Sequence, residues 1–130
     1  MSAITTHILD VSQGRPAKGI TVILELYLAG AKQPNPIYIK SGSDELVPWQ
    51  ELAKGESDND GRIKNLLPEE AVLVPGIYRL SFDTASYFKA LGTNSFYPCV
   101  SITFEIKDSK QHYHVPLLLS PFGYSTYRGS

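Results

Sequence analysis

Alternating hydrophobic and polar positions predict short β-strands along most of the chain. In residues 20–28, Val22, Leu24 and Leu26 share one face, because successive side chains of a strand point to opposite sides. The same period places Thr5, His7 and Leu9 on one face of a strand at 4–9. Further strands are predicted at 45–52, 76–83, 99–107, 113–119 and 123–127, with a short one at 37–39 inside a polar loop.

One segment has the period of a helix instead. Asp83 or Thr84 is a suitable N-cap, the helix extends through Leu91, and Gly92 is a suitable left-handed stop. Seven or eight short strands and one helix in 130 residues predict an all-β protein, an antiparallel β-sandwich that forms a single domain over 1–130. Pro116 conflicts mildly with this arrangement, since a central strand needs the backbone donor that proline lacks.

Composition and charge exclude several function classes. Hydrophobic residues make up 42% of the chain and charged residues 19%, which is typical of a folded domain. A net charge of −1 without a basic run disfavours nucleic acid as a partner. We expect no membrane association, because no apolar run approaches the roughly 20 residues of a membrane span. The first residues do not resemble a secretion signal, and the lone Cys99, expected to be buried, fits a reducing compartment.

The three histidines, His7, His112 and His114, are the first candidates for chemistry. Neutral imidazole accepts a proton near pH 7, and positions 112 and 114 share one face of a strand. The alternatives are hydrogen-bonded histidines with a structural role, or a zinc site, although no acidic or thiol ligand accompanies the pair. Residues 56–61 resemble the start of a calcium loop, but Leu67 stands where a bidentate Glu is required. This segment is therefore predicted to be a turn that presents Arg62.

The last four residues carry an unusual density of polar groups. Tyr127, Arg128, Gly129 and Ser130 supply a phenol, a guanidinium, a flexible backbone position and a hydroxyl with the terminal carboxylate. A chain end is usually frayed, whereas an end folded into a site could use each of these groups. Common nucleotide-binding, redox and serine-hydrolase motifs do not occur in the sequence.

Several motifs together resemble the 5-hydroxyisourate hydrolases, the transthyretin-related enzymes of urate breakdown. The resemblance extends from end to end, with a stretch at about 31–44 that looks longer than in most members. It rests on these motifs: Thr5-Thr6-His7-Ile8-Leu9-Asp10, Gly14-Arg15-Pro16-Ala17, Asp60-Gly61-Arg62, and the end of the chain from His112 to Ser130. Residues 76–78 and 83–92 also resemble transthyretin itself.

The resemblance implies a transthyretin-like sandwich and a homotetramer, a dimer of dimers whose active sites lie at subunit interfaces. His7, Arg62 and His114 match catalytic positions of the family, and Tyr127, Arg128 and Ser130 belong to the terminal motif, which binds substrate together with His7 and Arg62. His112 matches a position with no expected catalytic role. No cofactor and no metal are implied.

Two functions follow from the resemblance. The first is hydrolysis of a cyclic amide, the ring opening of 5-hydroxyisourate to 2-oxo-4-hydroxy-4-carboxy-5-ureidoimidazoline in purine degradation. The alternative is a non-catalytic tetrameric carrier of a planar aromatic ligand, but transthyretin itself lacks these histidines and the terminal motif. The expected location is cytoplasmic, with the peroxisome as an alternative, although the terminal Arg-Gly-Ser is not a Ser-Lys-Leu type of address.

Overall fold

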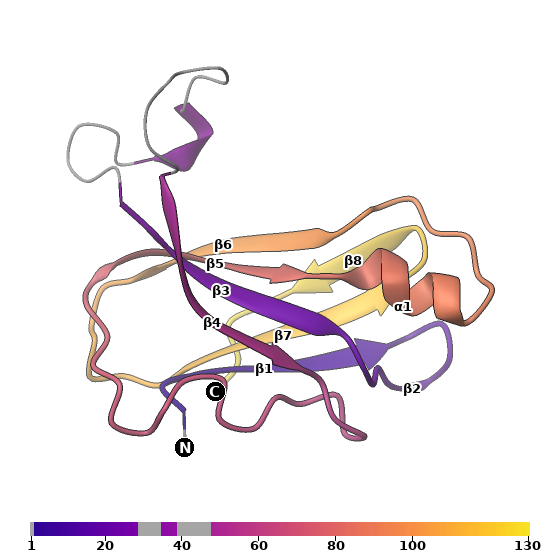
Figure 1. The fold of residues 1–130 in the computed structure, drawn as a ribbon, viewed down its shortest axis with the longest axis horizontal. Coiled ribbons are helices and arrows are strands. Elements are labelled where there is room, and N and C mark those ends of the chain that lie inside the picture. Colours follow the sequence, from indigo (N-terminus) through magenta and orange to yellow (C-terminus); the bar gives the residue numbers. More distant parts are fainter. Residues whose placement is uncertain (1, 29–34, 39–47) are drawn as a thin grey trace.

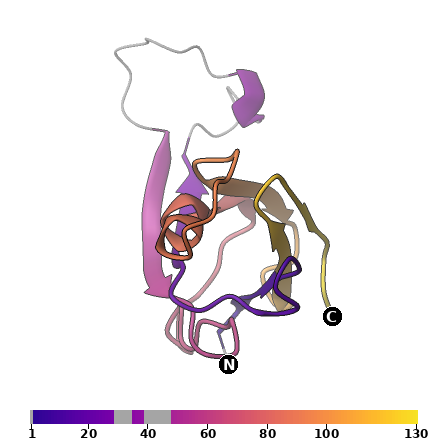
Figure 2. The ribbon, with the colours of Figure 1, turned by 90° about the vertical axis from the view of Figure 1, so that its right-hand side faces the viewer.

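The computed structural model describes residues 2–28, 35–38 and 48–130, and shows two four-stranded sheets packed face to face. The first sheet has the order β2-β1-β7-β8 and the second the order β4-β3-β5-β6 (Figure 1). An end-on view shows the sheets as two layers, with the C-terminal segment along the outside of β7 and β8 (Figure 2). The strands are β1 (Ile4–Asp10), β2 (Arg15–Pro16), β3 (Thr21–Tyr27), β4 (Trp49–Glu56), β5 (Gly76–Phe82), β6 (Val100–Ile106), β7 (Tyr113–Ser120) and β8 (Gly123–Thr126).

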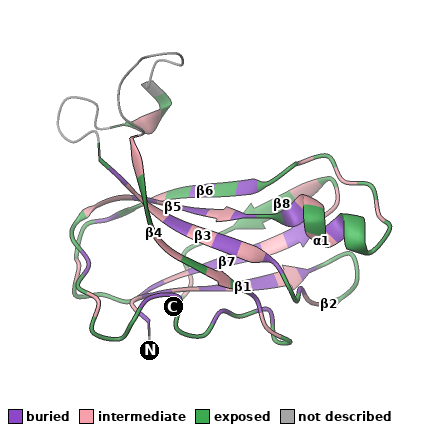
Figure 3. Ribbon diagram, viewed as in Figure 1, coloured by how far each residue is buried: buried purple, intermediate pink, exposed green. Residues whose placement is uncertain are grey.

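Alternating burial along each strand divides the first sheet into two faces. Ile4, Thr6 and Ile8 of β1 are buried against the second sheet, whereas the residues between them are only half-buried (Figure 3). On β7, Tyr113 and Val115 are likewise buried toward the core, and His114 lies on the opposite face. The sheet therefore presents Thr5, His7 and His114 together on its outer face.

The pair formed by β1 and β7 is parallel, whereas the other strand pairs of the described residues are antiparallel. Its register places Thr5 opposite His114 and His7 opposite Pro116. The ladder between β7 and β8 begins at Leu117, one residue beyond Pro116. Pro116 lies inside the ladder to β1, but its carbonyl accepts from the Thr126 hydroxyl on the β8 side. The N and C=O of a strand residue face the same neighbour, so the missing donor costs no hydrogen bond to β1, and this resolves the conflict seen in the sequence.

The helix α1 (Thr84–Ala90) forms where the change of period predicted it. The Asp83 side chain accepts a hydrogen bond from the Ser86 N–H, and Gly92 has a φ of 68°, so both ends have the expected caps. Phe88, 2% exposed, anchors the helix in the core, a burial that contributes roughly 1.5–3 kcal/mol. The Tyr87 hydroxyl donates to the fully buried Asp10 carboxylate (2.7 Å), which fastens the helix to β1.

The all-β sandwich with one short helix is confirmed. Two local expectations are wrong, and a third is confirmed in part. The segment predicted as a strand at 37–39 begins as a 3-10 helix, Pro36–Tyr38, because Pro36 fixes a helical φ and Asn35 caps the turn at Ile37. The strand predicted at 45–52 is confirmed over 49–52 and extends further, as Trp49–Glu56. Residues 39–47 lie outside the described residues, as does most of the polar loop. Cys99 is exposed rather than buried, because it precedes the first strand residue, Val100.

Candidate active site

The turn that carries Arg62 is attached directly to β1. His7 and Arg62 form an antiparallel bridge, and the Ile8 N–H donates to the Gly61 carbonyl (2.8 Å). This short stretch of chain therefore acts as an additional partner of β1, next to His7. Backbone pairing sets the relative position of the imidazole and the guanidinium, which come from residues 55 positions apart in the sequence.

Two residues give this turn its shape. The Asp58 carboxylate accepts hydrogen bonds from the backbone N–H groups of Asp60 (2.9 Å) and Arg62 (3.1 Å). The bond from Arg62 is the main reason why the pKa of Asp58 is lowered. Gly61 has a φ of 74°, and a Cβ at this position would collide with the Ile8 carbonyl oxygen. No other residue type fits here without moving Arg62 away from His7.

The ring of His7 has one nitrogen fixed by the same turn. His7 Nε2 lies 2.8 Å from the Asp60 carbonyl oxygen. A carbonyl only accepts hydrogen bonds, so Nε2 carries the proton in the neutral ring and Nδ1 holds the lone pair. A half-buried histidine in this tautomer can accept a proton at Nδ1 or, once charged, return it.

A threonine hydroxyl joins the other two histidines. Thr5 Oγ1 lies 2.8 Å from His114 Nδ1 and 3.0 Å from His112 Nε2. The two rings are nearly parallel, with an angle of 14° between their planes and 6.4 Å between their centres. His112 is exposed, whereas His114 is half-buried. The parallel register of β1 and β7 creates this group, because it places Thr5 opposite His114.

The environment of His114 favours its neutral form. Burial is the largest cause that lowers its pKa below the usual 6.5, followed by repulsion from Arg62 and from the protonated forms of His112 and His7. A backbone hydrogen bond to Thr5 opposes this effect and raises the pKa. His114 is therefore an unprotonated base near neutral pH, and it lies within the electrostatic field of Arg62.

The end of the chain is folded onto β7 rather than frayed. The Thr126 hydroxyl donates to the Pro116 carbonyl (2.7 Å), and the Gly129 N–H donates to the His114 carbonyl (2.8 Å). The Gly129 backbone lies against the imidazole of His114, with no room for a Cβ. The terminal segment thus covers one edge of the His114 ring, and its role in substrate binding stays a prediction.

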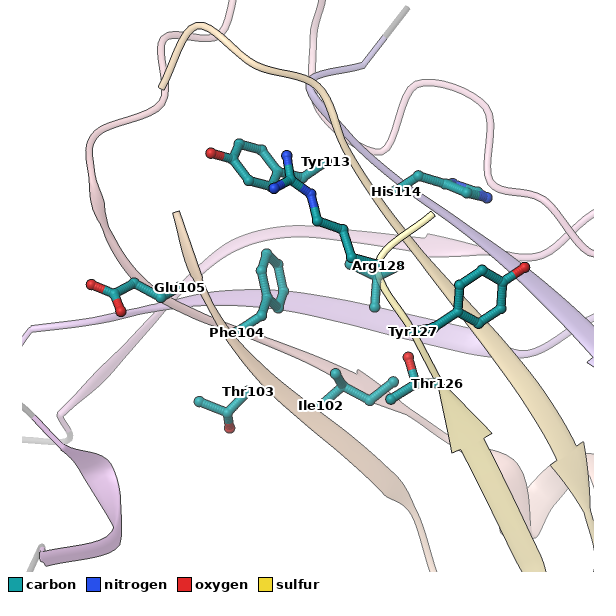
Figure 4. A pocket seen from close by; sticks show the side chains of 10 residues that line it. Ile102, Thr103, Phe104, Glu105, Tyr113, His114, Thr126, Tyr127 and Arg128 are labelled. Carbon is teal, nitrogen blue, oxygen red and sulfur yellow. The ribbon is translucent and has the colours of Figure 1, made fainter. Parts of the chain in front are cut away.

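Tyr127 and Arg128 point in different directions (Figure 4). Arg128 donates to the Gln111 side chain (2.7 Å), and its guanidinium lies 4.7 Å from the centre of the Tyr113 ring. Tyr127 is 58% exposed. A cavity of about 250 Å³ opens between β6 and the terminal segment. Its lining includes Phe104, Tyr113, His114, Thr126, Tyr127 and Arg128, but not His7 or Arg62.

The predicted site residues are thus brought together in part. His7, Arg62 and His114 meet at the outer face of β1 and β7, and Gly129 carries the exposed Ser130 to its edge. The Arg128 guanidinium lies toward Tyr113 instead, so its substrate-binding role stays a prediction. Within the described part of the chain, no group of three His, Cys, Asp or Glu side chains is arranged to hold a metal ion.

Sequence reasoning missed two residues that shape the site. Thr5 could have been found from the sequence, because the alternation of a strand placed its side chain on the same face as His7. Its contact with His114, however, depends on a pairing between strands 109 positions apart. Asp58 could also have been found, since the side chain of an Asp at the start of a turn commonly accepts hydrogen bonds from backbone N–H groups two or more residues further along the chain.

Comparison with known proteins agrees with this fold. A family model described as the HIUase/Transthyretin family matches residues 4–129. The chain belongs to this family. It is 43% identical to a 5-hydroxyisourate hydrolase of Salmonella typhimurium over 127 residues, which cover 98% of this chain and 80% of the relative.

Solved structures of family members have the same fold. The 5-hydroxyisourate hydrolase of Klebsiella pneumoniae superposes with a TM-score of 0.72 at 35% identity, covering 98% of both chains. Sea bream transthyretin in complex with thyroxine superposes with a TM-score of 0.79 at 29% identity, covering 98% of this chain and 95% of that one. The family thus includes hydrolases and a thyroxine-binding transthyretin that share one fold.

None of the helices in the described segments has the length and apolar character of a membrane span.

Proposed function

We propose that this chain is a 5-hydroxyisourate hydrolase, which opens the ring of its substrate at a cyclic amide in urate degradation. The observation that carries the proposal is the meeting of His7, Arg62 and His114 on the outer face of the first sheet. Hydrolysis of an amide needs a base for water and a cation for the developing oxyanion. Identity to hydrolases of the family over nearly the whole chain supports the same function.

The proposed reaction uses these groups in sequence. A histidine accepts a proton from water as the oxygen attacks the ring carbonyl, and Arg62 stabilises the negative charge on that carbonyl oxygen. The C–N bond then breaks, the protonated histidine returns its proton to the leaving nitrogen, and a carboxylic acid forms that ionises at neutral pH. The lowered pKa favours His114 as the base, and His7 is placed to hold or return a proton at Nδ1.

The carrier alternative is favoured by one observation, the likeness to a transthyretin in complex with thyroxine. A carrier binds a planar aromatic ligand without changing it and has no use for a neutral base beside a guanidinium. Ultraviolet absorbance of freshly generated 5-hydroxyisourate distinguishes the two. We expect its decay to accelerate in proportion to protein concentration, whereas tight binding without turnover would establish the carrier.

The proposal includes a homotetramer with sites between subunits. What supports it, besides the family, is that the site lies on an open sheet face beside half-buried Leu9 and Leu118. A second copy facing this sheet would close the site and cover these apolar side chains. Light scattering should give about four times the chain mass of 14.4 kDa. A fully active monomer would contradict this assembly.

A further inference from the structure

Thr5 occupies a position that the proposed reaction does not yet use. Its hydroxyl lies within hydrogen-bonding distance of His114 Nδ1 and His112 Nε2 at once. A hydroxyl has one proton to donate and two lone pairs that accept. It can therefore donate to one imidazole while it accepts from the other, so the protonation pattern of one ring constrains that of its neighbour.

We infer that Thr5 is a positioning residue that holds His114 in the tautomer with the proton on Nδ1 and the lone pair on Nε2; the inference rests on the proposed function. In this arrangement His114 Nδ1–H donates to Thr5 Oγ1, and the Thr5 hydroxyl donates to His112 Nε2. The ring nitrogen on the far side from Thr5, Nε2, is then the one that accepts a proton from water.

Two arguments favour this direction over its reverse. When His114 is protonated, both ring nitrogens carry protons and Thr5 Oγ1, 2.8 Å from Nδ1, can only accept from Nδ1–H. The neutral tautomer that keeps this bond gains and loses its proton at Nε2 without any rotation of the hydroxyl. His112 is exposed, so its Nδ1–H can bond to water. Its Nε2 is then free to accept from the Thr5 hydroxyl, and neither ring nitrogen of His112 is left without a partner. In the reverse direction the one lone pair of the neutral His114 ring, on Nδ1, would accept from the Thr5 hydroxyl, and no lone pair would be left to take a proton from water.

Several elements bring charged or titratable groups to the ring. Arg62 belongs to the turn beside β1, His7 to β1 and His112 to the residues before β7, and repulsion from these three groups lowers the pKa of His114. The terminal segment packs on the ring through Gly129 and carries the Arg128 guanidinium and the chain end at Ser130. Thr5 differs from these groups because its hydroxyl carries no charge. Its oxygen accepts more strongly from a charged ring than from a neutral one, so it also stabilises the imidazolium that forms when water is deprotonated.

The test compares Thr5→Val with Thr5→Ser. Valine keeps the branched shape but removes the hydroxyl, whereas serine retains it. We expect Thr5→Val to lower kcat roughly 5- to 10-fold with KM nearly unchanged, the effect of one lost hydrogen bond on the tautomer equilibrium, and Thr5→Ser to restore most of it. The acid limb of kcat/KM should move to lower pH in Thr5→Val, because loss of the acceptor lowers the pKa of His114 further.

Thr6→Val is the matched control on the same strand. The Thr6 hydroxyl donates to the Val115 carbonyl on the buried face (2.6 Å), so this variant should lower thermal stability and leave the pH profile in place. Equal losses of kcat in Thr5→Ser and Thr5→Val, or an unshifted acid limb in Thr5→Val, would overturn the inference.

A spectroscopic measurement tests the tautomer without any turnover. In protein labelled with ¹⁵N-histidine, the neutral His114 ring should show a protonated Nδ1 and an unprotonated Nε2. The opposite pattern would refute the role of Thr5 even in an active enzyme. Absence of turnover in the unmodified protein would instead contradict the proposed function, and the nitrogen spectrum would still decide the tautomer.

Discussion

The Gly129 backbone lies against the imidazole ring of His114, closer than a side chain on residue 129 would allow. A Cβ built on Gly129 would lie 3.1 Å from His114 Cγ and still closer to Cδ2. The same residue donates its N–H to the His114 carbonyl. One glycine therefore fixes the end of the chain to the proposed base in two ways, through a backbone hydrogen bond and through contact with the Cγ and Cδ2 atoms of the ring.

The first prediction concerns this contact. Gly129→Ala should lower kcat/KM on the order of 10²-fold, because a displacement of about 1 Å of the ring or of the tail disturbs the geometry of reaction. The free energy of unfolding should change by no more than about 0.5 kcal/mol, as is usual at a surface position. Gly123→Ala is the control, since its Cβ would meet Ser120 Oγ at an ordinary 3.7 Å. Unchanged turnover in Gly129→Ala would show that the contact has no role in catalysis.

The second prediction concerns the three groups proposed for chemistry. His7→Ala, Arg62→Ala and His114→Ala should each lower kcat/KM by about 10²–10⁴-fold, because alanine supplies neither proton transfer nor charge stabilisation. Circular dichroism and light scattering should show folded protein of unchanged mass. His112→Ala should be much milder, since His112 acts on His114 only through Thr5 and its charge. Near-normal turnover in any of the three variants would remove that residue from the mechanism.

The sequence predicted the elements and the candidate side chains but not how they meet. Local periodicity was sufficient to predict β3 and α1, because the spacing of buried side chains along one segment shows whether it is a strand or a helix. The neighbours of His114 depend instead on the parallel pairing of β1 with β7, which no local pattern specifies. Cys99 shows the same limit: its residue type favours burial, but its position just before β6 leaves it exposed.

The third prediction is the pH dependence of turnover. Because the pKa of His114 is lowered from the usual 6.5, more than half of the base is neutral at pH 6.5, so kcat/KM should stay above half of its maximum there and decrease at lower pH. The same shift implies that the unfolded chain binds this proton more tightly than the folded one, and stability should decrease as the pH falls below about 6.5. An acid limb of kcat/KM centred above pH 7 would contradict the assignment of His114 as the base.

The fourth prediction concerns metal. His112 and His114 share Thr5 rather than an acidic or thiol ligand, and the proposed chemistry needs no metal. Activity should therefore survive prolonged chelation and dialysis, and elemental analysis should find far less than one zinc per chain. About one zinc per chain, with activity lost on its removal and regained on its return, would make the protein a metallohydrolase.

The fifth prediction isolates the end of the chain as a part of the site. Deleting Gly129 and Ser130 removes the hydrogen bond to the His114 carbonyl and uncovers one edge of its ring. The deletion leaves the hydrogen bond between Thr126 and Pro116 intact, so β8 should stay in place. Ser130 is exposed and its neighbour only half-buried, so the deletion removes little buried apolar surface and the thermal midpoint should stay near that of the full chain.

Turnover should respond differently, because the proposed base loses the backbone that positions it. We expect the deletion to lower kcat/KM by at least about tenfold. A tag appended after Ser130 should also lower kcat/KM, although it leaves Gly129 able to contact His114. Steady-state kinetics and the thermal midpoint, measured on the same preparations, separate a catalytic loss from a folding loss. If the truncated protein keeps full kcat/KM, the site ends at Tyr127, and the fit of Gly129 against His114 serves packing alone.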